Sequence, residues 1–97
     1  MGYVFEVMDK SGRKIHLSKE RWGEHIKLEH PDINDASEIE LTLKDPDKVV
    51  EIKKDINHHY KYFKHRNSES KYLKVIVKYL NKEGFVITAY YVKNIRK

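Results

Sequence analysis

The sequence contains no cysteine, which excludes disulfide frameworks, thiolate zinc sites, iron–sulfur clusters and cysteine nucleophiles. Long apolar stretches are also missing, and no segment approaches the roughly 18 consecutive apolar residues of a membrane-spanning helix. The N-terminal segment lacks the basic residues and apolar run of a secretory signal. We therefore expect a cytoplasmic protein that does not enter a membrane.

Apolar side chains are scarce as well. They make up 39% of the 97 residues, against about 45–50% in an average domain, while charged side chains make up 36%. A chain of this length suits a single domain with a small core. The runs of Val, Ile and Leu after residue 70 are unlike a disordered chain, which lacks such residues. We expect one folded domain over residues 1–97.

Positive charge is concentrated in the second half of the chain. Up to Lys48 there are eight basic and eleven acidic residues, and beyond it twelve basic and four acidic ones, so the two parts carry net charges of −3 and +8. This asymmetry predicts one positive face on the folded domain, as in polyanion binders. Tyrosines and histidines between the lysines can stack on bases, which makes nucleic acid the leading partner. The alternative is that the lysines only solvate the outer face of a sheet.

Local patterns predict a hairpin and two short helices in the first half. Apolar and more polar residues alternate in the segments before and after residues 9–12, which have the composition of a turn. This pattern predicts an N-terminal hairpin. A helix is expected over residues 19–30, with Ser18 as its N-cap and Pro31 as its stop, and a second helix over residues 36–44.

Beyond Lys48 the hydrophobic period changes from that of a helix to the period of two that strands show. The expected helices come before most of the expected strands, and the two do not alternate as they do in βαβ units. This order predicts an α+β fold. We expect the hairpin and the two helices to be followed by an antiparallel sheet of about four strands. These strands are expected at Val49–Lys53, His58–His65, Tyr72–Leu80 and Phe85–Val92.

The last hairpin allows a prediction of register. Gly84 suits the left-handed position of a three-residue loop with a bulge, which sets Asn81 opposite Phe85 and Lys78 opposite Thr88. One face is then apolar and consists of Leu73, Val75, Val77, Tyr79, Ile87, Ala89 and Tyr91. The other face presents donors around a slot for an anionic backbone, namely Lys74, Lys78, Thr88 and Tyr90.

His25 is the first candidate for chemistry. At 100° per residue it lies within the apolar arc of the first helix, between Leu28 and Trp22, and so faces the core or the sheet. One interpretation is a hydrogen-bonded core histidine. The other is an acid–base group, with Glu29 one turn on to orient the ring and Arg21 one turn back.

The basic segment around residues 58–66 is the second candidate. His58, His59 and His65 do not predict a metal site, because no carboxylate or cysteine lies at a matching spacing. Lys64 and Arg66 at a strand end can clamp a phosphate, or they are ordinary exposed bases. We expect no metal and no cofactor, since Gly-rich phosphate loops and nucleophile elbows are also missing.

Several short motifs come in a familiar order. They are RWGEHI (21–26), EHPD (29–32), DPD (45–47), YKYFK (60–64), YLKVIVK (72–78) and FVITAYY (85–91). Over roughly residues 13–92, this order resembles the phage-associated nuclease branch of the barnase, EndoU, colicin and RelE superfamily, the BECR fold. The resemblance implies a metal-independent endoribonuclease, a hydrolase that often acts as a toxin. It points to His25, the basic strand over residues 62–64 and Thr88.

Together the residues and the resemblance predict RNA cleavage through attack of the ribose 2′-hydroxyl, which leaves a 2′,3′-cyclic phosphate. The predicted catalytic residues are His25, Lys64 and Thr88. The predicted RNA-binding residues are Arg21, His30, Tyr62, Arg66, Lys74, Lys78 and Tyr90. Two alternatives stay open: a non-catalytic nucleic-acid-binding domain of the same fold, and an interaction module for an acidic partner protein such as an antitoxin or immunity protein.

Overall fold

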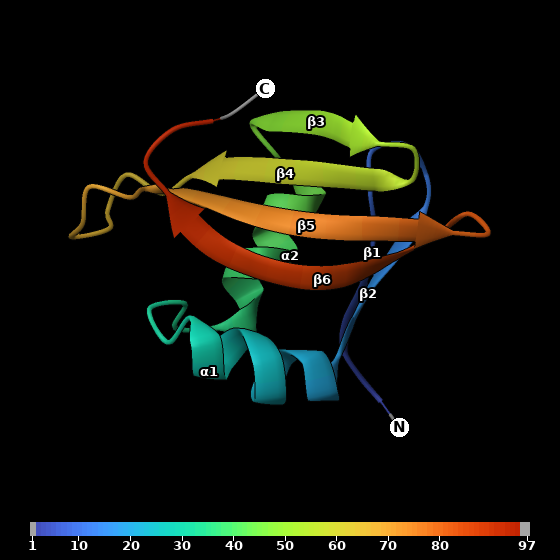
Figure 1. The fold of residues 1–97 in the computed structure, drawn as a ribbon, viewed down its shortest axis with the longest axis horizontal. Coiled ribbons are helices and arrows are strands. Elements are labelled where there is room, and N and C mark those ends of the chain that lie inside the picture. Colours follow the sequence, from blue (N-terminus) through green and yellow to red (C-terminus); the bar gives the residue numbers. More distant parts are fainter. Residues whose placement is uncertain (1, 96–97) are drawn as a thin grey trace.

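The structure is a computed structural model that describes residues 2–95. Six strands form one mixed sheet in the order β1-β2-β6-β5-β4-β3 (Figure 1). The α+β class expected from the sequence is confirmed. The strands are β1 (Tyr3–Met8), β2 (Lys14–Ser18), β3 (Lys48–Lys53), β4 (Ile56–Tyr62), β5 (Tyr72–Leu80) and β6 (Glu83–Val92), and the helical segments are the π-helical η1 (Arg21–Ile26), α1 (Lys27–Glu29) and α2 (Ala36–Lys44).

The sheet is larger than the four antiparallel strands that we expected. β3 to β6 do form an antiparallel run of four, but the N-terminal hairpin belongs to the same sheet, because β2 pairs in parallel with the start of β6. Lys14 lies opposite Glu83 and His16 opposite Phe85. This pairing supplies partners for backbone groups at the edge of β6 that would otherwise have none.

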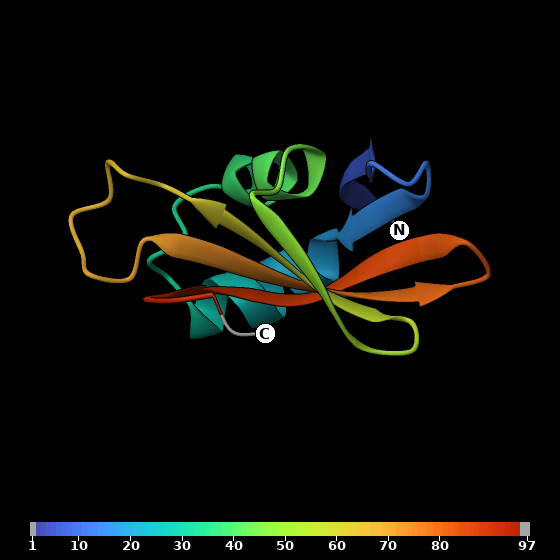
Figure 2. The ribbon, with the colours of Figure 1, turned by 90° about the horizontal axis from the view of Figure 1, so that it is seen from above.

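The core lies between α2 and the sheet. Figure 2 shows that the β1–β2 hairpin curls towards the side of strands β3 to β6 on which α2 lies. Ile39 and Leu43 of α2 are fully buried, as are Val75 and Val77 of β5 and Ile26 of η1. Within residues 2–95, no helix lies across the opposite side of β3 to β6, and η1 and α1 run along the edge of β6 (Figures 1 and 2). On that side, the side chains of Tyr62 and Lys78 are exposed.

The first helix begins and ends where expected but has a different winding. The hydroxyl of Ser18 accepts a hydrogen bond from the backbone N–H of Arg21, and the helix ends at Glu29, with His30 as its C-cap before Pro31. Residues 21–26 form a π-helix, whose hydrogen bonds run from i to i+5 and whose turns hold more residues than those of an α-helix. The 100° spacing therefore fails, and His25 is exposed. The expectation that His25 faces the core or the sheet was wrong.

The second helix, α2, matches the prediction. The carboxylate of Asp35 accepts a hydrogen bond from the backbone N–H of Ser37 at 3.0 Å, which satisfies one of the free donors at the helix start. Ile39 and Leu43, one turn apart, face the core. The helix ends before Pro46, since a proline disfavours helical geometry in the residue before it.

The last hairpin has a tighter turn than predicted. Leu80 lies opposite Glu83, so the turn has two residues, Asn81 and Lys82, with φ of 52° and 70°. Positive φ at both positions is typical of a type I′ turn. The predicted pairing of Lys78 with Thr88 was wrong, because Lys78 lies opposite Phe85.

A bulge lies further along this hairpin, between the pairs Ile76–Thr88 and Val77–Val86. Because of the bulge, Ile87 has no partner residue opposite it on β5. Val86, and not Ile87 as predicted, is therefore on the buried face. Beyond the bulge, Lys74 and Tyr90 lie opposite each other. The lysine, threonine and tyrosine positions of the predicted donor face therefore stay on one side of the sheet.

Gly84 is required for close packing and not for a turn. A Cβ atom at this position would lie 2.9 Å from Tyr79 Cε1 and 3.0 Å from side-chain carbons of Ile15 and Val77. We expect Gly84→Ala to lower the free energy of unfolding by about 1–3 kcal/mol, because the core must shift to admit the methyl group. Urea denaturation monitored by circular dichroism measures this change.

Gly23→Ala is the matched control for Gly84→Ala. A Cβ at Gly23, within η1, meets no atom within 4 Å. Replacing a helical glycine by alanine in open space is expected to raise the free energy of unfolding by roughly 0.5–1 kcal/mol. Equal destabilisation by the two substitutions would contradict the packing role of Gly84.

Candidate nucleic-acid interface

Three rows of side chains cross the side of the sheet that α2 leaves uncovered, and we call these rows the open face. Residues directly opposite each other on neighbouring strands project to the same side, so the registers of β4, β5 and β6 define the rows. The rows are His58–Ile76–Thr88, Tyr60–Lys74–Tyr90 and Tyr62–Tyr72–Val92. Lys78 extends the open face by one more position along β5.

Tyr90 lies on β6, the strand of the open face nearest to the first helix, and its ring contacts His30 and Lys74. The imidazole of His30, at the end of α1, stacks on its ring, with centroids 5.3 Å apart and planes 28° apart. Lys74 Nζ lies 5.2 Å from the centroid of the same ring. An aromatic ring, an imidazole and an ammonium group therefore lie together, as binding of stacked bases and phosphates requires.

A second pair of rings lies at the end of β4. Tyr62 and Tyr72 are 5.2 Å apart between centroids, with planes tilted by 57°. The backbone N–H of Tyr62 donates to the carboxylate of Asp47 at 2.7 Å, which fixes the strand end. The side chain of Tyr62 stays 46% exposed, so its ring is available to a ligand.

His58 adds a neutral imidazole to the open face. Its ring lies edge-on to that of Tyr60, with centroids 6.4 Å apart. Partial burial, followed by the positive charge of Lys74, lowers the pKa of His58 below its usual value. The ring is therefore mostly uncharged near neutral pH and can accept a proton or a hydrogen bond.

The end of this side of the sheet near β1 and β2 is acidic. His16 is buried there between the rings of Tyr3 and Phe85, at 4.5 and 5.3 Å between centroids. Its Nδ1 lies 3.0 Å from Glu6 Oε2, and its Nε2 lies 2.6 Å from Glu83 Oε1. The two carboxylates repel phosphates, so the open face is bounded on this side. No sequence spacing predicted this cluster, because its residues are far apart along the chain.

The predicted catalytic residues come from three separate places. His25 is exposed on η1, Lys64 is exposed in the loop after β4, and Thr88 is in a row of the open face. Within residues 2–95, no hydrogen bond or ion pair joins any two of them. The strand expected over residues 58–65 ends at Tyr62, which is why Lys64 lies in a loop.

The predicted RNA-binding residues divide into two groups. Tyr62, Lys74, Lys78, Tyr90 and His30 lie on or beside the open face. The other two do not belong to it: Arg21 is half-buried at the start of η1, and Arg66 takes part in a different site.

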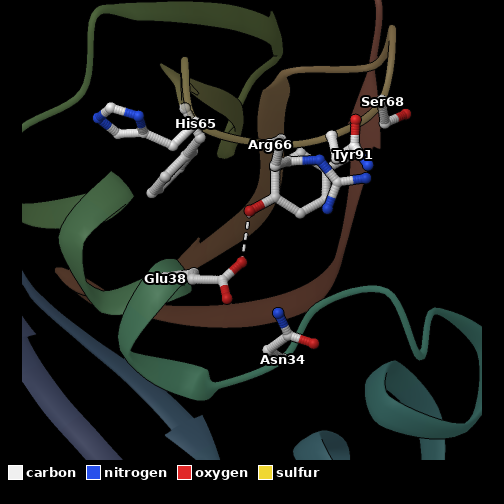
Figure 3. Close-up of a pocket in the computed structure, with 8 residues that line it drawn as sticks. Asn34, Glu38, His65, Arg66, Ser68 and Tyr91 are labelled. Carbon is white, nitrogen blue, oxygen red and sulfur yellow. Dashed lines mark hydrogen bonds between the residues drawn. The ribbon is translucent and has the colours of Figure 1, made fainter.

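Arg66 faces a cavity at the end of the sheet near α2 (Figure 3). Its Nε donates to the carbonyl of Ser70 at 2.9 Å, and its guanidinium lies 3.2 Å from Asp32 Oδ2. The guanidinium carbon lies 3.5 Å from the centroid of the Tyr91 ring. The cavity has a volume of about 410 Å³ and is lined by Asn34, Glu38, Phe63, His65, Arg66, Asn67, Ser68 and Tyr91.

Glu38 and Tyr91 form the polar centre of this cavity. The Tyr91 hydroxyl donates a short hydrogen bond to Glu38 Oε1, as the dashed line in Figure 3 shows. Burial, followed by this hydrogen bond and the charge of Glu38, raises the pKa of Tyr91 above its usual value. The sequence indicated α2 only as a core-packing helix, so Glu38 was missed.

A buried polar cluster lies on the core side, near the β1–β2 turn. Tyr79 donates to Asp9 Oδ2 at 2.8 Å, and its hydroxyl oxygen lies 3.3 Å from His59 Nε2. Burial raises the pKa of Asp9, but hydrogen bonds from Ser11, Arg13 and Tyr79 outweigh it and lower the pKa overall. Burial lowers the pKa of His59 to about 4. The cluster is neutral at its histidine and charged at its carboxylate.

In the part of the chain that the structure describes, no three His, Asp or Glu side chains are grouped to hold a metal ion. None of the helical segments within residues 2–95 has the length and apolar composition needed to cross a bilayer. Comparison with protein-family models, curated proteins and solved structures finds no match for this chain.

Proposed function

We propose that this protein binds single-stranded RNA across the open face. The observation that carries the proposal is the placement of the Lys74 ammonium 5.2 Å from the centroid of the Tyr90 ring, on a side of the sheet that no helix covers within residues 2–95. Phosphates find a cation there, and bases find the ring of Tyr90 beside it and the exposed ring of Tyr62 at the end of β4, whereas Tyr60 is buried beneath the surface. The concentration of positive charge beyond Lys48 favours the same partner.

A single strand suits this surface better than a duplex does. The bases of a single strand can be splayed and stacked on exposed tyrosines, whereas the bases of a duplex are already stacked on each other. Tyr62, Tyr72 and Tyr90 provide such rings at two places on the open face. A strand can therefore contact several rings while its backbone passes Lys74 and Lys78.

Lys74→Ala tests the binding site directly. We expect it to weaken binding of a fluorescent octanucleotide about fivefold to tenfold, equivalent to about 1 kcal/mol, because one charge-assisted phosphate contact is lost. The slope of log affinity against log salt should fall by about 0.7, as one counterion fewer is released. Fluorescence anisotropy across a salt series measures both.

Lys44→Ala is the matched control, since it removes the same charge from α2, behind the sheet, where Lys44 pairs with Glu40. It should leave the affinity and the salt slope almost unchanged. If Lys44→Ala weakens binding as much as Lys74→Ala does, net charge rather than the open face determines affinity.

Metal-independent cleavage of the bound RNA is the second candidate function. The observation that favours it is that two imidazoles, His30 and His58, lie by the same surface as Lys74 and Thr88. One imidazole can take the proton of the ribose 2′-hydroxyl while the other protonates the leaving 5′-oxygen, and Lys74 stabilises the charge on phosphorus. Such a nuclease would belong to the toxin class if its expression is toxic and an acidic partner protein relieves the toxicity.

Incubation of the pure protein with end-labelled RNA in EDTA tests this candidate. Cleavage that leaves 2′,3′-cyclic phosphate ends, and that is lost in His30→Ala or His58→Ala, supports it. Loss in His25→Ala alone would support the centre on η1 that the sequence predicted. Binding without any cyclic-phosphate product would leave RNA binding as the function.

A further inference from the structure

The cavity of Figure 3 lies directly behind one end of the open face. Neighbouring residues of a strand point to opposite sides of a sheet. Tyr90 lies on the open face, and Tyr91, the next residue, lines the cavity. In the same way, Tyr62 contributes its ring to the open face, and Phe63 lines the cavity. A strand that passes the Tyr62–Tyr72 pair therefore reaches the cavity by turning round the end of the sheet.

The cavity differs from the open face in charge. Glu38 places a carboxylate in it, and this carboxylate is half-buried. Its Oε1 accepts the hydrogen bond from Tyr91, whereas its Oε2 has no hydrogen-bond or ion-pair partner within residues 2–95. A phosphate is repelled by such a group, but an N–H donor is attracted to it. The carboxylate therefore favours a donor-bearing neutral group.

The rest of the lining suits a flat ring. The guanidinium of Arg66 lies over Tyr91, and Phe63 contacts the same tyrosine edge-on, with centroids 5.9 Å apart. In Figure 3 the amide of Asn34 points into the space beside the Glu38 carboxylate. The volume of about 410 Å³ lies within the range of small-molecule sites. Aromatic and guanidinium planes stack on nucleobases, and amide groups hydrogen-bond to their edges.

We propose that the cavity takes one base of the RNA strand bound on the open face, and that it selects a base with an exocyclic amino group. The amino group donates to Glu38 Oε2, as amino groups of bases do to carboxylates elsewhere. Uracil has no such group, so it loses this hydrogen bond. This inference rests on the proposed RNA binding and adds a base preference to it.

Comparison of oligocytidylate and oligouridylate of equal length tests the inference. With the unmodified protein, we expect the cytidine octamer to bind about tenfold more tightly than the uridine octamer, the size of one good base contact. Glu38→Gln should abolish or invert this preference, because the amide can donate at the position where Oε2 accepts and still accept the Tyr91 hydrogen bond. Glu40→Gln, on the same helix, is the matched control and should keep the preference.

A second variant covers the case in which Glu38→Gln disturbs the fold. Asn67 is exposed at the cavity rim, so Asn67→Trp should fill the cavity, leave the circular dichroism spectrum unchanged and remove the preference for cytidine. Equal affinities of the two octamers for the unmodified protein would overturn the base site and leave RNA binding intact. No binding of either octamer would overturn the proposed function itself.

Discussion

Acidification from pH 6.5 to pH 4 is expected to lower the free energy of unfolding by about 3 kcal/mol through His59 alone. The pKa of this histidine falls from 6.5 in an unfolded chain to about 4 in the folded protein, because its ring is buried. Its exposed fraction is only 3%, so solvent screens the effect little. The unfolded state therefore binds the proton more tightly, and stability that is complete above pH 6.5 is lost as the pH falls towards 4.

Groups around His59 modify this dependence. Burial, the largest effect, disfavours a proton on the ring, and the charges of Arg13 and His58 act in the same direction. The carboxylate of Asp9 favours the proton, but it is outweighed. The lowered pKa of Asp9 acts in the same direction as that of His59, since a carboxylate stabilised in the folded state also loses stability on acidification.

Urea denaturation at one-unit steps from pH 7.5 to pH 4.5 measures the pH dependence. His59→Gln removes the titrating ring, so the fall in stability between pH 6.5 and pH 4.5 should shrink by about 1 kcal/mol per pH unit. His65→Gln, in an exposed loop, should keep the dependence of the unmodified protein. An unchanged dependence in His59→Gln would show that the buried ring does not titrate as described.

Asp9→Ala is expected to cost about 3 kcal/mol of stability at pH 7. Asp9 Oδ1 accepts hydrogen bonds from the backbone N–H and hydroxyl of Ser11 and from the backbone N–H of Arg13, and Oδ2 accepts from Tyr79. The substitution leaves these donors without their acceptor, and the buried Tyr79 hydroxyl cannot turn to bulk water. Arg13 is affected as well. Its guanidinium carbon lies 3.6 Å from the centroid of the Tyr79 ring, and its Nε lies 3.6 Å from Asp9 Oδ2, so the substitution removes the carboxylate that it pairs with.

Two comparisons separate the parts of this effect. Tyr79→Phe removes one hydrogen bond and should cost about 1 kcal/mol, much less than Asp9→Ala. Asp35→Ala removes a carboxylate that caps α2 in an exposed position, and it should also cost about 1 kcal/mol. Thermal unfolding of all three variants measures the order. Equal costs for Asp9→Ala and Asp35→Ala would mean that burial adds nothing to the Asp9 contacts.

Local patterns predicted the elements whose boundaries are set locally. The limits of α2 follow from a capping aspartate and a proline, and those of β5 follow from nine alternating residues, so both were predicted at the right positions. Three features depend on distant packing and were not predicted. They are the π-helical winding of η1, the parallel pairing of β2 with β6, and the bulge in β6.

The open face was predicted despite an error in register. Side chains alternate with a period of two, so a register error of two residues keeps every residue on its side of the sheet. The pairs beyond the bulge differ from the prediction by two residues, and for this reason Lys74, Thr88 and Tyr90 still share a side. Glu38, Asp9 and His59 were missed as site residues because their partners lie on other elements, and no spacing along one segment reveals such contacts.

The pairing of residues 14–16 with residues 83–85 also sets the order of events during synthesis. The hairpin at the start of the chain has its neighbouring strand only after most of the sequence has been translated. Until then β1 and β2 expose an edge that can pair with other nascent chains. The six-stranded sheet can therefore close only after residues 83–85 have left the ribosome.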